Sequence, residues 1–443
     1  MNIEDIYRVF LKGKEITTDS RACAAGSVFV SLRGQTFNGN AFARKALEGG
    51  CSCAIIDDAS YAVKGDKRYI LVDDSLRTLQ QLAYIHRERL GTPVIAITGS
   101  NGKTSTKELT SAVLSRKYNV LYTEGNLNNH IGVPKTLLRL TEKDDIAVIE
   151  MGANHCGEIK TLAEIAAPNH AVITNVGRAH LEGFGSFAGV KRTKGELYDY
   201  IKNRRGDGFI FINRDDKDLR AMADERKLRN RVYYGASEDK ANSVSGIVTG
   251  CSPFLNFKWH TSHNGLFDNT FHEVSTHVIG SYNIYNMLAA AAVGHFFNVS
   301  DDDISAALAN YTPRNNRSQM IRTEHNRLIV DAYNANPTSM AAAIGDFSRM
   351  DYGNKMLIIG EMAELGEASE DEHRKLVDLL QGNGFKDVWL VGDAFKCFAG
   401  GDYPFFDDVE AVKEAITAHQ PQGKTIFIKG SHSTRLYELP ALL

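Results

Sequence analysis

The stretch from Val94 to Leu109 combines an apolar run, two glycines and the triplet Gly102-Lys103-Thr104. Val94 to Ile97 predicts a buried strand and Thr104 to Leu114 predicts a helix, so the glycines fall in the turn between them. The N-terminus of a helix offers unpaired N–H groups and a positive dipole end to an anion. We therefore expect this turn to bind nucleotide phosphates, with Lys103 at the terminal phosphates and the Thr104 hydroxyl on Mg²⁺.

This turn is shorter than the general phosphate-loop pattern G-x-x-x-x-G-K-[ST]. Ile97 stands where that pattern has its first glycine, so the loop is of the T-G-x-x-G-K-T type. The alternative is an ordinary strand-turn-helix unit with a solvated lysine. The position of Gly-Lys-Thr directly after a strand favours phosphate binding.

Further polar clusters follow predicted strands. The apolar run 145–150 ends in Glu150, and a carboxylate beside a phosphate loop is typical of metal binding. The segments 125–134 and 177–185 are also polar and rich in turn residues, and strand ends are where open α/β sheets bind ligands. His180 by itself is typical of a loop histidine, but beside an expected Mg²⁺ site it becomes a candidate ligand or phosphate contact.

The composition is that of a globular protein. The 443 residues are too many for one core, while 43% hydrophobic and 24% charged residues with a net charge of −3 show no bias toward nucleic acid or anionic membranes. The sequence shows no signal peptide and no apolar run of membrane-spanning length, so we expect a cytoplasmic protein. Six scattered cysteines indicate reduced thiols, and Cys51-Ser-Cys53 lacks a second half for a metal site.

The pattern of apolar runs predicts an α/β fold with three domains, at residues 1–91, 92–312 and 313–443. In the first, a small α/β unit, we expect strands at 27–32 and 53–56 and helices at 42–48 and 76–89. In the second we expect a mostly parallel sheet covered on both faces, with strands at 94–97, 145–150, 170–177 and 208–213, a β-rich extension at 243–278 and a close-packing helix at 289–293.

The third domain is predicted to be Rossmann-like, with strands at 355–360, 387–392 and 424–430. It lacks the G-x-G-x-x-G fingerprint, so no dinucleotide cofactor is indicated.

Several motifs together resemble a known family, the Mur ligases, which build the peptide of bacterial cell-wall precursors. The motifs are Thr98-Gly-Ser-Asn-Gly-Lys-Thr104, Gly125-Asn-Leu-Asn-Asn129, Glu150-Met-Gly-Ala-Asn154, His180-Leu-Glu-Gly-Phe-Gly185, Lys194-Gly-Glu196 and Asn283-Ile-Tyr-Asn286. The resemblance runs from Asp19-Ser-Arg21 to Lys429-Gly-Ser431, which is nearly the whole chain. With Asp331-Ala-Tyr-Asn-Ala-Asn336 and Gly360-Glu-Met-Ala-Glu-Leu-Gly366, it is most similar to the members that add D-alanyl-D-alanine.

The resemblance implies ATP-driven peptide bond formation through an acyl phosphate, with Mg²⁺ as the metal. The implied substrates are UDP-N-acetylmuramoyl-tripeptide and D-Ala-D-Ala, acted on by a monomer. The implied nucleotide-binding residues are Gly99, Ser100, Asn101, Gly102, Lys103, Thr104, Ser105, Asn283, Asn286, Arg317 and Asp331. The implied substrate-binding residues are Asp19, Ser20, Arg21, Asn38, Gly39, Asn128, Asn129, Asn334, Asn336, Lys429 and Ser431.

The family also implies a metal set. Thr104 and Glu150 would hold a first Mg²⁺, and His180 with a carbamylated Lys194 would serve a second. Lys103, His180 and Lys194 are therefore the implied catalytic residues. Without the resemblance, Lys194 is typical of a lysine on a helix surface.

This chain departs from the family pattern at two places. Tyr282 stands where a histidine usually precedes the adenine-contacting asparagine pair, and Arg314-Asn-Asn-Arg317 replaces the usual Pro-Gly-Arg. The arginine role is accordingly assigned to Arg317.

Two other functions fit parts of the pattern. One is a related amide ligase, either the tripeptide-forming Mur enzyme or a folylpolyglutamate synthase; the latter begins at its phosphate-loop domain and would lack residues 1–91. The other is a non-catalytic nucleotide-binding regulator, which would need Lys103 and Glu150 but not Lys194. The third residue of the substrate peptide, diaminopimelate or lysine, stays open.

Overall fold

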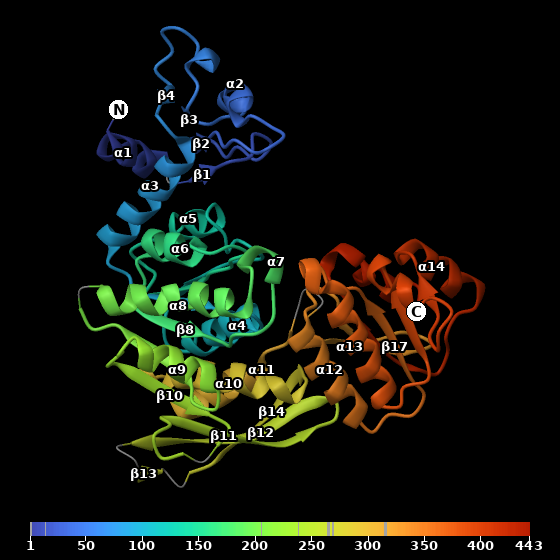
Figure 1. Ribbon diagram of the computed structural model, residues 1–443. Coiled ribbons are helices and arrows are strands. Elements are labelled where there is room, and N and C mark those ends of the chain that lie inside the picture. The colour runs from blue at the N-terminus through green and yellow to red at the C-terminus, as the bar shows by residue number, and fades with distance from the viewer. Residues whose placement is uncertain are drawn as a thin grey trace.

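Three β-sheets follow one another along the chain, each accompanied by helices, in a computed structural model (Figure 1). The structure describes residues 2–443 except 14, 205, 238, 264, 265, 268, 269 and 314–316. This arrangement confirms the predicted α/β class.

The first sheet has four parallel strands in the order β1-β2-β3-β4. Its strands are β1 (Ile16–Thr17), β2 (Val28–Val30), β3 (Cys53–Ile56) and β4 (Tyr69–Leu71). Its helices are α1 (Ile3–Gly13), η1 (Gly39–Phe42), α2 (Ala43–Glu48), η2 (Ala59–Tyr61) and α3 (Ser75–Leu90). All residues of β2 and β3 are buried, as expected for continuous apolar runs in a parallel sheet.

The central sheet has ten strands, in the order β13-β12-β11-β10-β9-β8-β5-β7-β6 with β14 beside β12. Its strands are β5 (Val94–Thr98), β6 (Val120–Tyr122), β7 (Ile146–Glu150), β8 (His170–Ile173), β9 (Phe209–Asn213), β10 (Arg231–Gly235), β11 (Val244–Cys251), β12 (Phe254–His263), β13 (Leu266–Phe267) and β14 (His272–Ile279). The pairings from β6 to β11 are parallel, and β12 pairs antiparallel with β11, β13 and β14. The antiparallel part is the predicted β-rich extension.

Helices cover both faces of this central sheet. They are α4 (Lys103–Leu114), α5 (Gly132–Leu137), α6 (Glu158–Ala166), α7 (Leu181–Phe184), α8 (Phe187–Asn203), α9 (Lys217–Glu225), η3 (Ser281–Asn283), α10 (Ile284–Phe296) and α11 (Asp301–Asn310). Alternate residues of β5 serve the two faces: Val94 packs with α5, α6 and α8, whereas Ile95 packs with α4, α10 and α11.

The third sheet has six strands in the order β15-β16-β20-β17-β18-β19, of which only the β15–β16 pairing is antiparallel. Its strands are β15 (Gln319–Arg322), β16 (Arg327–Asp331), β17 (Lys355–Gly360), β18 (Val388–Val391), β19 (Phe405–Phe406) and β20 (Thr425–Lys429). Its helices are α12 (Pro337–Arg349), η4 (Gly366–Ala368), α13 (Ser369–Gly382), η5 (Asp393–Phe398), α14 (Val409–Ala418), η6 (His432–Thr434) and η7 (Leu436–Ala441).

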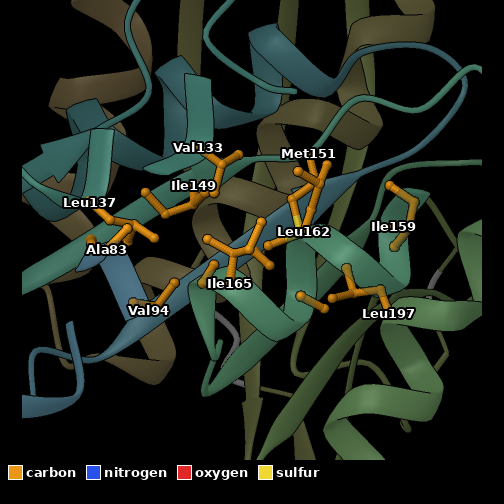
Figure 2. Packing of buried hydrophobic residues seen from close by; sticks show 14 of the residues in the cluster. Ala83, Val94, Val133, Leu137, Ile149, Met151, Ile159, Leu162, Ile165 and Leu197 are labelled. Atoms are coloured by element: carbon orange, nitrogen blue, oxygen red, sulfur yellow. The ribbon is translucent and has the colours of Figure 1, made fainter. Parts of the chain in front are cut away.

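Helix α3 joins the first two sheets into one core. Figure 2 shows Ala83 of α3 among side chains of the central domain, near Val94 and Leu137. Polar contacts reinforce this packing, because a ring nitrogen of His86 lies 2.8 Å from the Leu140 carbonyl oxygen. The hydrophobic cluster therefore continues from the first sheet into the central one without a break.

One predicted strand is too long. Residues 170–177 were expected to be a single strand, but β8 ends at Ile173. Beyond Ile173 the backbone turns toward the loop after β5, where the Ser100 N–H donates to the Asn175 carbonyl at 3.0 Å. The chain leaves the sheet because residues 174–177 support that loop.

Candidate active site

A cavity of about 1020 Å³ lies at the carboxyl ends of β5 and β7 and is lined by all three domains. It extends from Leu76 of α3 to Lys429 of β20. The residues that sequence analysis assigned to a site and that line this cavity are Ser100, Asn101, Gly102, Lys103, Thr104, Ser105, Asn128, Asn129, Glu150, His180, Asn283, Asn286, Arg317, Asp331, Asn334 and Lys429. The topology thus brings the predicted nucleotide, metal and acceptor residues to one cavity.

The loop between β5 and α4 requires its two glycines. Gly99 has φ 147° and Gly102 has φ 77°, in the region that disfavours other residues. A Cβ atom on Gly99 would lie 1.9 Å from Thr174 Oγ1, and one on Gly102 would lie 2.5 Å from Asn286 Oδ1. The backbone of the loop is therefore held close to its neighbours, with the N-terminus of α4 facing the cavity.

Two residues after β8 hold the loop in place. The Asn101 N–H donates to Asn175 Oδ1 at 3.0 Å, and Asn175 Nδ2 donates back to the Asn101 carbonyl at 3.0 Å. Thr174 Oγ1 donates to the same carbonyl at 2.6 Å. Thr174 and Asn175 were not among the predicted site residues; the signal that marks them is a polar pair directly after an apolar strand.

Lys103 lies folded over this loop. Its Nζ donates to the carbonyl oxygens of Gly99 at 2.8 Å and Ser100 at 3.1 Å. Burial lowers the pKa of this lysine, and the nearby Glu150 carboxylate opposes that shift. A cation held by loop carbonyls is placed to exchange them for the stronger acceptors of a phosphate group.

Of the two carboxylate oxygens of Glu150, one accepts a hydrogen bond and the other has none among the described residues. Its side chain is 1% exposed; Oε1 accepts from Asn128 Nδ2 at 2.8 Å, whereas buried Oε2 has no hydrogen-bond partner among the described residues. A buried carboxylate oxygen without a partner is costly, and a divalent cation would satisfy it. The buried Thr104 lines the same cavity, so this pair fits Mg²⁺.

His180 and Lys194 meet at Phe184. The His180 ring is edge-on to the Phe184 ring at 6.1 Å between centroids, and Lys194 Nζ lies 5.4 Å from the centroid of the same ring. Lys194 is 1% exposed; burial, and then repulsion from Lys103, lower its pKa well below the usual range. Within the described part of the chain, no three His, Cys, Asp or Glu side chains form a ready metal cluster. A cation here would need further ligands from a modified lysine or from phosphate.

The predicted adenine-contacting pair forms a hydrogen-bonded chain next to the loop. Asn286 Nδ2 donates to Asn283 Oδ1 at 2.7 Å, although Asn283 ends η3 and is the N-cap of α10, whereas the two asparagines were expected on one helix. Thr106 Oγ1 of α4 donates to Asn286 Oδ1 at 3.0 Å. The pair is therefore oriented from both sides.

The C-terminal domain contributes the charged side chains of Asp331, Lys429 and Arg317 to the cavity lining. Asp331, at the end of β16, forms an ion pair with the buried Lys429 at the end of β20. The Arg317 guanidinium lies 3.8 Å from the centroid of the Tyr333 ring. Lys429 Nζ also donates to the Asn334 carbonyl at 3.3 Å. Of the segment 314–317, where the sequence departs from the family pattern, only Arg317 is among the described residues.

Some predicted site residues lie away from the cavity lining. Asn336 caps α12 and its Nδ2 donates to Asn101 Oδ1 at 2.6 Å, so it ties the C-terminal domain to the loop. Ser431 Oγ accepts from the Ala363 N–H at 2.8 Å and supports residues 361–366. In the N-terminal domain, Asp19 pairs with Arg21 at 2.8 Å and the Asn38 side chain caps η1. The remaining residues off the lining are Ser20, Gly39, Gly99 and Lys194.

The three sheets and their shared cavity define a multidomain α/β protein built around a phosphate-loop nucleotide site. Three family profiles match the chain in order: "Mur ligase family, catalytic domain" over residues 13–87, "Mur ligase middle domain" over 97–294, and "Mur ligase, glutamate ligase domain" over 316–432. The chain belongs to the Mur ligase family, which confirms the resemblance predicted from its motifs.

Similar proteins match over nearly their whole length. The UDP-N-acetylmuramoyl-tripeptide--D-alanyl-D-alanine ligase of Escherichia coli is 36% identical, with 99% of this chain and 96% of that protein covered. The ligase of the same name from Bacillus subtilis is 33% identical, with 96% and 92% covered.

Two solved structures have the same fold. The crystal structure of MurF from Acinetobacter baumannii superposes with a TM-score of 0.85 at 32% identity, covering 97% of this chain and 93% of that one. MurF from Thermotoga maritima in complex with ADP gives 0.84 at 26% identity, covering 98% and 97%. No helix in the described part of this chain is long and apolar enough to cross a membrane.

Proposed function

We propose that this chain is an ATP-dependent ligase that joins D-alanyl-D-alanine to UDP-N-acetylmuramoyl-tripeptide in peptidoglycan synthesis. The observation that carries the proposal is its near full-length similarity, at 33% and 36% identity, to two ligases named for that reaction. The cavity supports it, because one phosphate loop faces residues from all three domains. We further propose a monomer that acts in the cytoplasm.

The reaction has two steps. The terminal carboxylate of the tripeptide attacks the γ-phosphate of ATP, giving an acyl phosphate and ADP. The amine of D-Ala-D-Ala then attacks the acyl carbon, releasing phosphate and a proton. Both steps gather negative charge, so cations and oriented N–H donors at the phosphates provide the main stabilisation.

The residues of the loop are placed for the first step. Lys103 would move from the carbonyls of Gly99 and Ser100 to the phosphates, beside the N–H groups at the start of α4. Asn283 and Asn286 would contact the adenine. Thr104 and Glu150 would hold Mg²⁺, which neutralises phosphate charge when bound.

Lys194 would act after modification. Its lowered pKa favours the neutral amine, which can add to CO₂ to form a carbamate with release of one proton. The carbamate supplies a carboxylate-like oxygen pair close to His180 and suited to a second Mg²⁺.

The flanking domains would hold the two substrates. We assign the uridine nucleotide to the N-terminal loops that contain Asp19, Ser20, Arg21, Asn38 and Gly39, and the peptide to Asn128 and Asn129. The acceptor dipeptide is assigned to the C-terminal wall with Asn334, Asn336, Lys429 and Ser431. Arg317 and Asp331 of the same wall would contact the nucleotide.

Phosphate release tests the proposal. We expect release only when ATP, Mg²⁺, UDP-N-acetylmuramoyl-tripeptide and D-Ala-D-Ala are all present, with one peptide bond formed per phosphate. Substrate peptides ending in diaminopimelate and in lysine are compared in parallel. Activity with a single amino acid on the dipeptide precursor would indicate the tripeptide-forming enzyme instead, and hydrolysis without acceptor would indicate a nucleotide-binding regulator.

A further inference from the structure

A carboxylate from the C-terminal domain reaches the histidine of the expected metal site. Glu364, in the segment between β17 and η4, contacts Nδ1 of His180, in the segment before α7, through its Oε2 atom. The His180 side chain is 17% exposed and that of Glu364 is 48% exposed. Figure 1 shows α7 at the side of the central domain that faces the C-terminal domain.

Both partners of this pair have an unusual backbone. His180 has φ 51° and Glu364 has φ 62°, although neither is glycine. Such conformations cost free energy and persist where surrounding contacts impose them, often at functional sites. The backbone at Glu364 is fixed by its neighbours, since the Met362 N–H donates to His373 Nε2 at 2.9 Å and the Ala363 N–H donates to Ser431 Oγ at 2.8 Å. These hydrogen bonds hold in place the backbone that carries the Glu364 carboxylate.

The pairing decides which ring nitrogen of His180 is available. The Glu364 carboxylate lies against Nδ1, in a contact that lacks the alignment of a hydrogen bond, so Nε2 is the nitrogen that His180 can offer to the cavity that it lines. Histidines that bind metals usually direct their other ring nitrogen to a carboxylate, which fixes the tautomer and the ring orientation. We propose that Glu364 is a positioning residue that orients His180 toward the second cation, an inference that rests on the proposed function.

This arrangement makes the cation site depend on domain docking. The histidine belongs to the central domain and its orienting carboxylate to the C-terminal domain. The same contact is held by an ion pair between Arg178 and Glu372 at 3.0 Å, and by the backbone of Glu182, whose N–H donates to the Glu364 carbonyl at 3.4 Å. The second cation is therefore held tightly only when the C-terminal domain is docked on α7.

Direct Mn²⁺ binding tests this role without turnover. The full-length enzyme, saturated with a non-hydrolysable methylene analogue of ATP and with bicarbonate present, is titrated with Mn²⁺ and the free ion is measured by electron paramagnetic resonance. We expect two bound Mn²⁺ per wild-type chain. Glu364→Ala should weaken the second Mn²⁺ by about 10- to 100-fold and leave the first unchanged. Glu364→Gln, whose amide oxygen can still accept from Nδ1–H, should retain most of the affinity.

Glu367→Ala is the matched control, because Glu367 is an exposed carboxylate three residues further along the chain, in η4. It should bind both ions as the wild type does. Equal weakening in Glu367→Ala and Glu364→Ala would overturn the positioning role, since any disturbance of the segment would then suffice. Two tight Mn²⁺ in Glu364→Ala would overturn it as well. A wild-type enzyme that binds one Mn²⁺ would instead refute the second metal site of the proposed function.

Discussion

Two lysines of the expected site are stabilised in different ways. The Lys103 ammonium is hydrogen-bonded to two carbonyl oxygens of its own loop, whereas the Lys194 side chain forms no hydrogen bond or ion pair with another described residue and packs on Phe184. Burial is the main cause of the low Lys194 pKa, and repulsion from Lys103 adds to it. The lysine with acceptors is suited to bind phosphate, and the one without is suited to modification.

Replacing Lys103 with alanine should lower turnover by several orders of magnitude. The ammonium is needed most as negative charge develops on the transferred phosphoryl group, so kcat should fall far more than nucleotide affinity. The measurement is steady-state phosphate release together with ATP titration by calorimetry. A folded Lys103→Ala enzyme with near-normal turnover would remove the lysine from the mechanism.

Replacing Lys194 with alanine should abolish most activity while ATP binding is largely retained. The carbamate oxygens would be lost, and bicarbonate should not restore them, but acetate could occupy the vacated space and recover part of the rate. Lys191→Ala is the control, because Lys191 lies on the same helix. Its Nζ forms an ion pair with Asp218 at 2.5 Å, and neither residue lines the cavity. The carbamate assignment fails if Lys194→Ala is fully active without added carboxylate, or if wild-type activity survives CO₂ removal with Lys194 shown to be unmodified.

At the scale of single elements, the sequence predicted those strands and helices whose pattern is local. Val94–Thr98 and Ile146–Glu150 are continuous apolar runs, and both form buried central strands. The extent of β8 was overestimated, because Thr174 and Asn175 leave the sheet to bond with Asn101, a partner more than seventy residues away. Apolar periodicity does not encode such a contact.

The candidate site was predictable to a similar degree. Glu150 and Lys103 follow from their places at strand and helix ends, and the structure brings both to the cavity. Glu364 could not be predicted as a partner of His180, because their contact depends on how two separately folded sheets dock. Ser431 was predicted from a motif but supports the backbone of Ala363.

The first residue of β8 should make stability depend on pH. His170 is packed among Phe209, Phe296 and Phe297, and burial lowers its pKa to about 4. The unfolded chain protonates this histidine near pH 6.5, so below that pH the unfolded state binds more protons than the folded state. Stability should therefore fall as the pH is lowered through about 6.5 toward about 4, by about 2 kcal/mol between pH 7.5 and pH 5.

Urea unfolding at pH 7.5 and pH 5.0 checks this. His170→Asn removes the titrating group but keeps an acceptor for the Phe209 N–H, which donates to His170 Nδ1 at 3.3 Å. In this variant the free energy of unfolding should differ between the two pH values by about 2 kcal/mol less than in the wild type. His419→Asn, at an exposed position after α14, should keep the wild-type difference. An unchanged difference in His170→Asn would show that this ring is protonated in the folded state.

At the scale of the whole molecule, the two flanking domains are attached in different ways. The N-terminal domain shares a continuous hydrophobic cluster with the central one, and the buried Arg87 of α3 bonds to the Asn169 side chain before β8. The C-terminal domain meets the central one at polar contacts, including Asn101 with Asn336 and Ser281 with Asp346, and at a smaller apolar contact in which Ile279 of β14 joins the C-terminal cluster. Polar interfaces of this kind are rearranged more readily than a shared core.

Domain closure should accordingly be driven by the substrates together. The N-terminal loops to which we assign the uridine nucleotide lie outside the cavity lining, whereas Lys429 and Asp331 of the C-terminal domain line the cavity. A substrate that contacts both the N-terminal loops and these C-terminal residues must therefore draw the C-terminal domain inward. We expect small-angle scattering to give a smaller radius of gyration when UDP-N-acetylmuramoyl-tripeptide and a non-hydrolysable ATP analogue are both present. Either ligand alone serves as the control and should give a smaller change, because each contacts only part of the three-domain site. Scattering curves that are identical with and without both ligands would mean that the free protein already has the catalytic arrangement of its three domains.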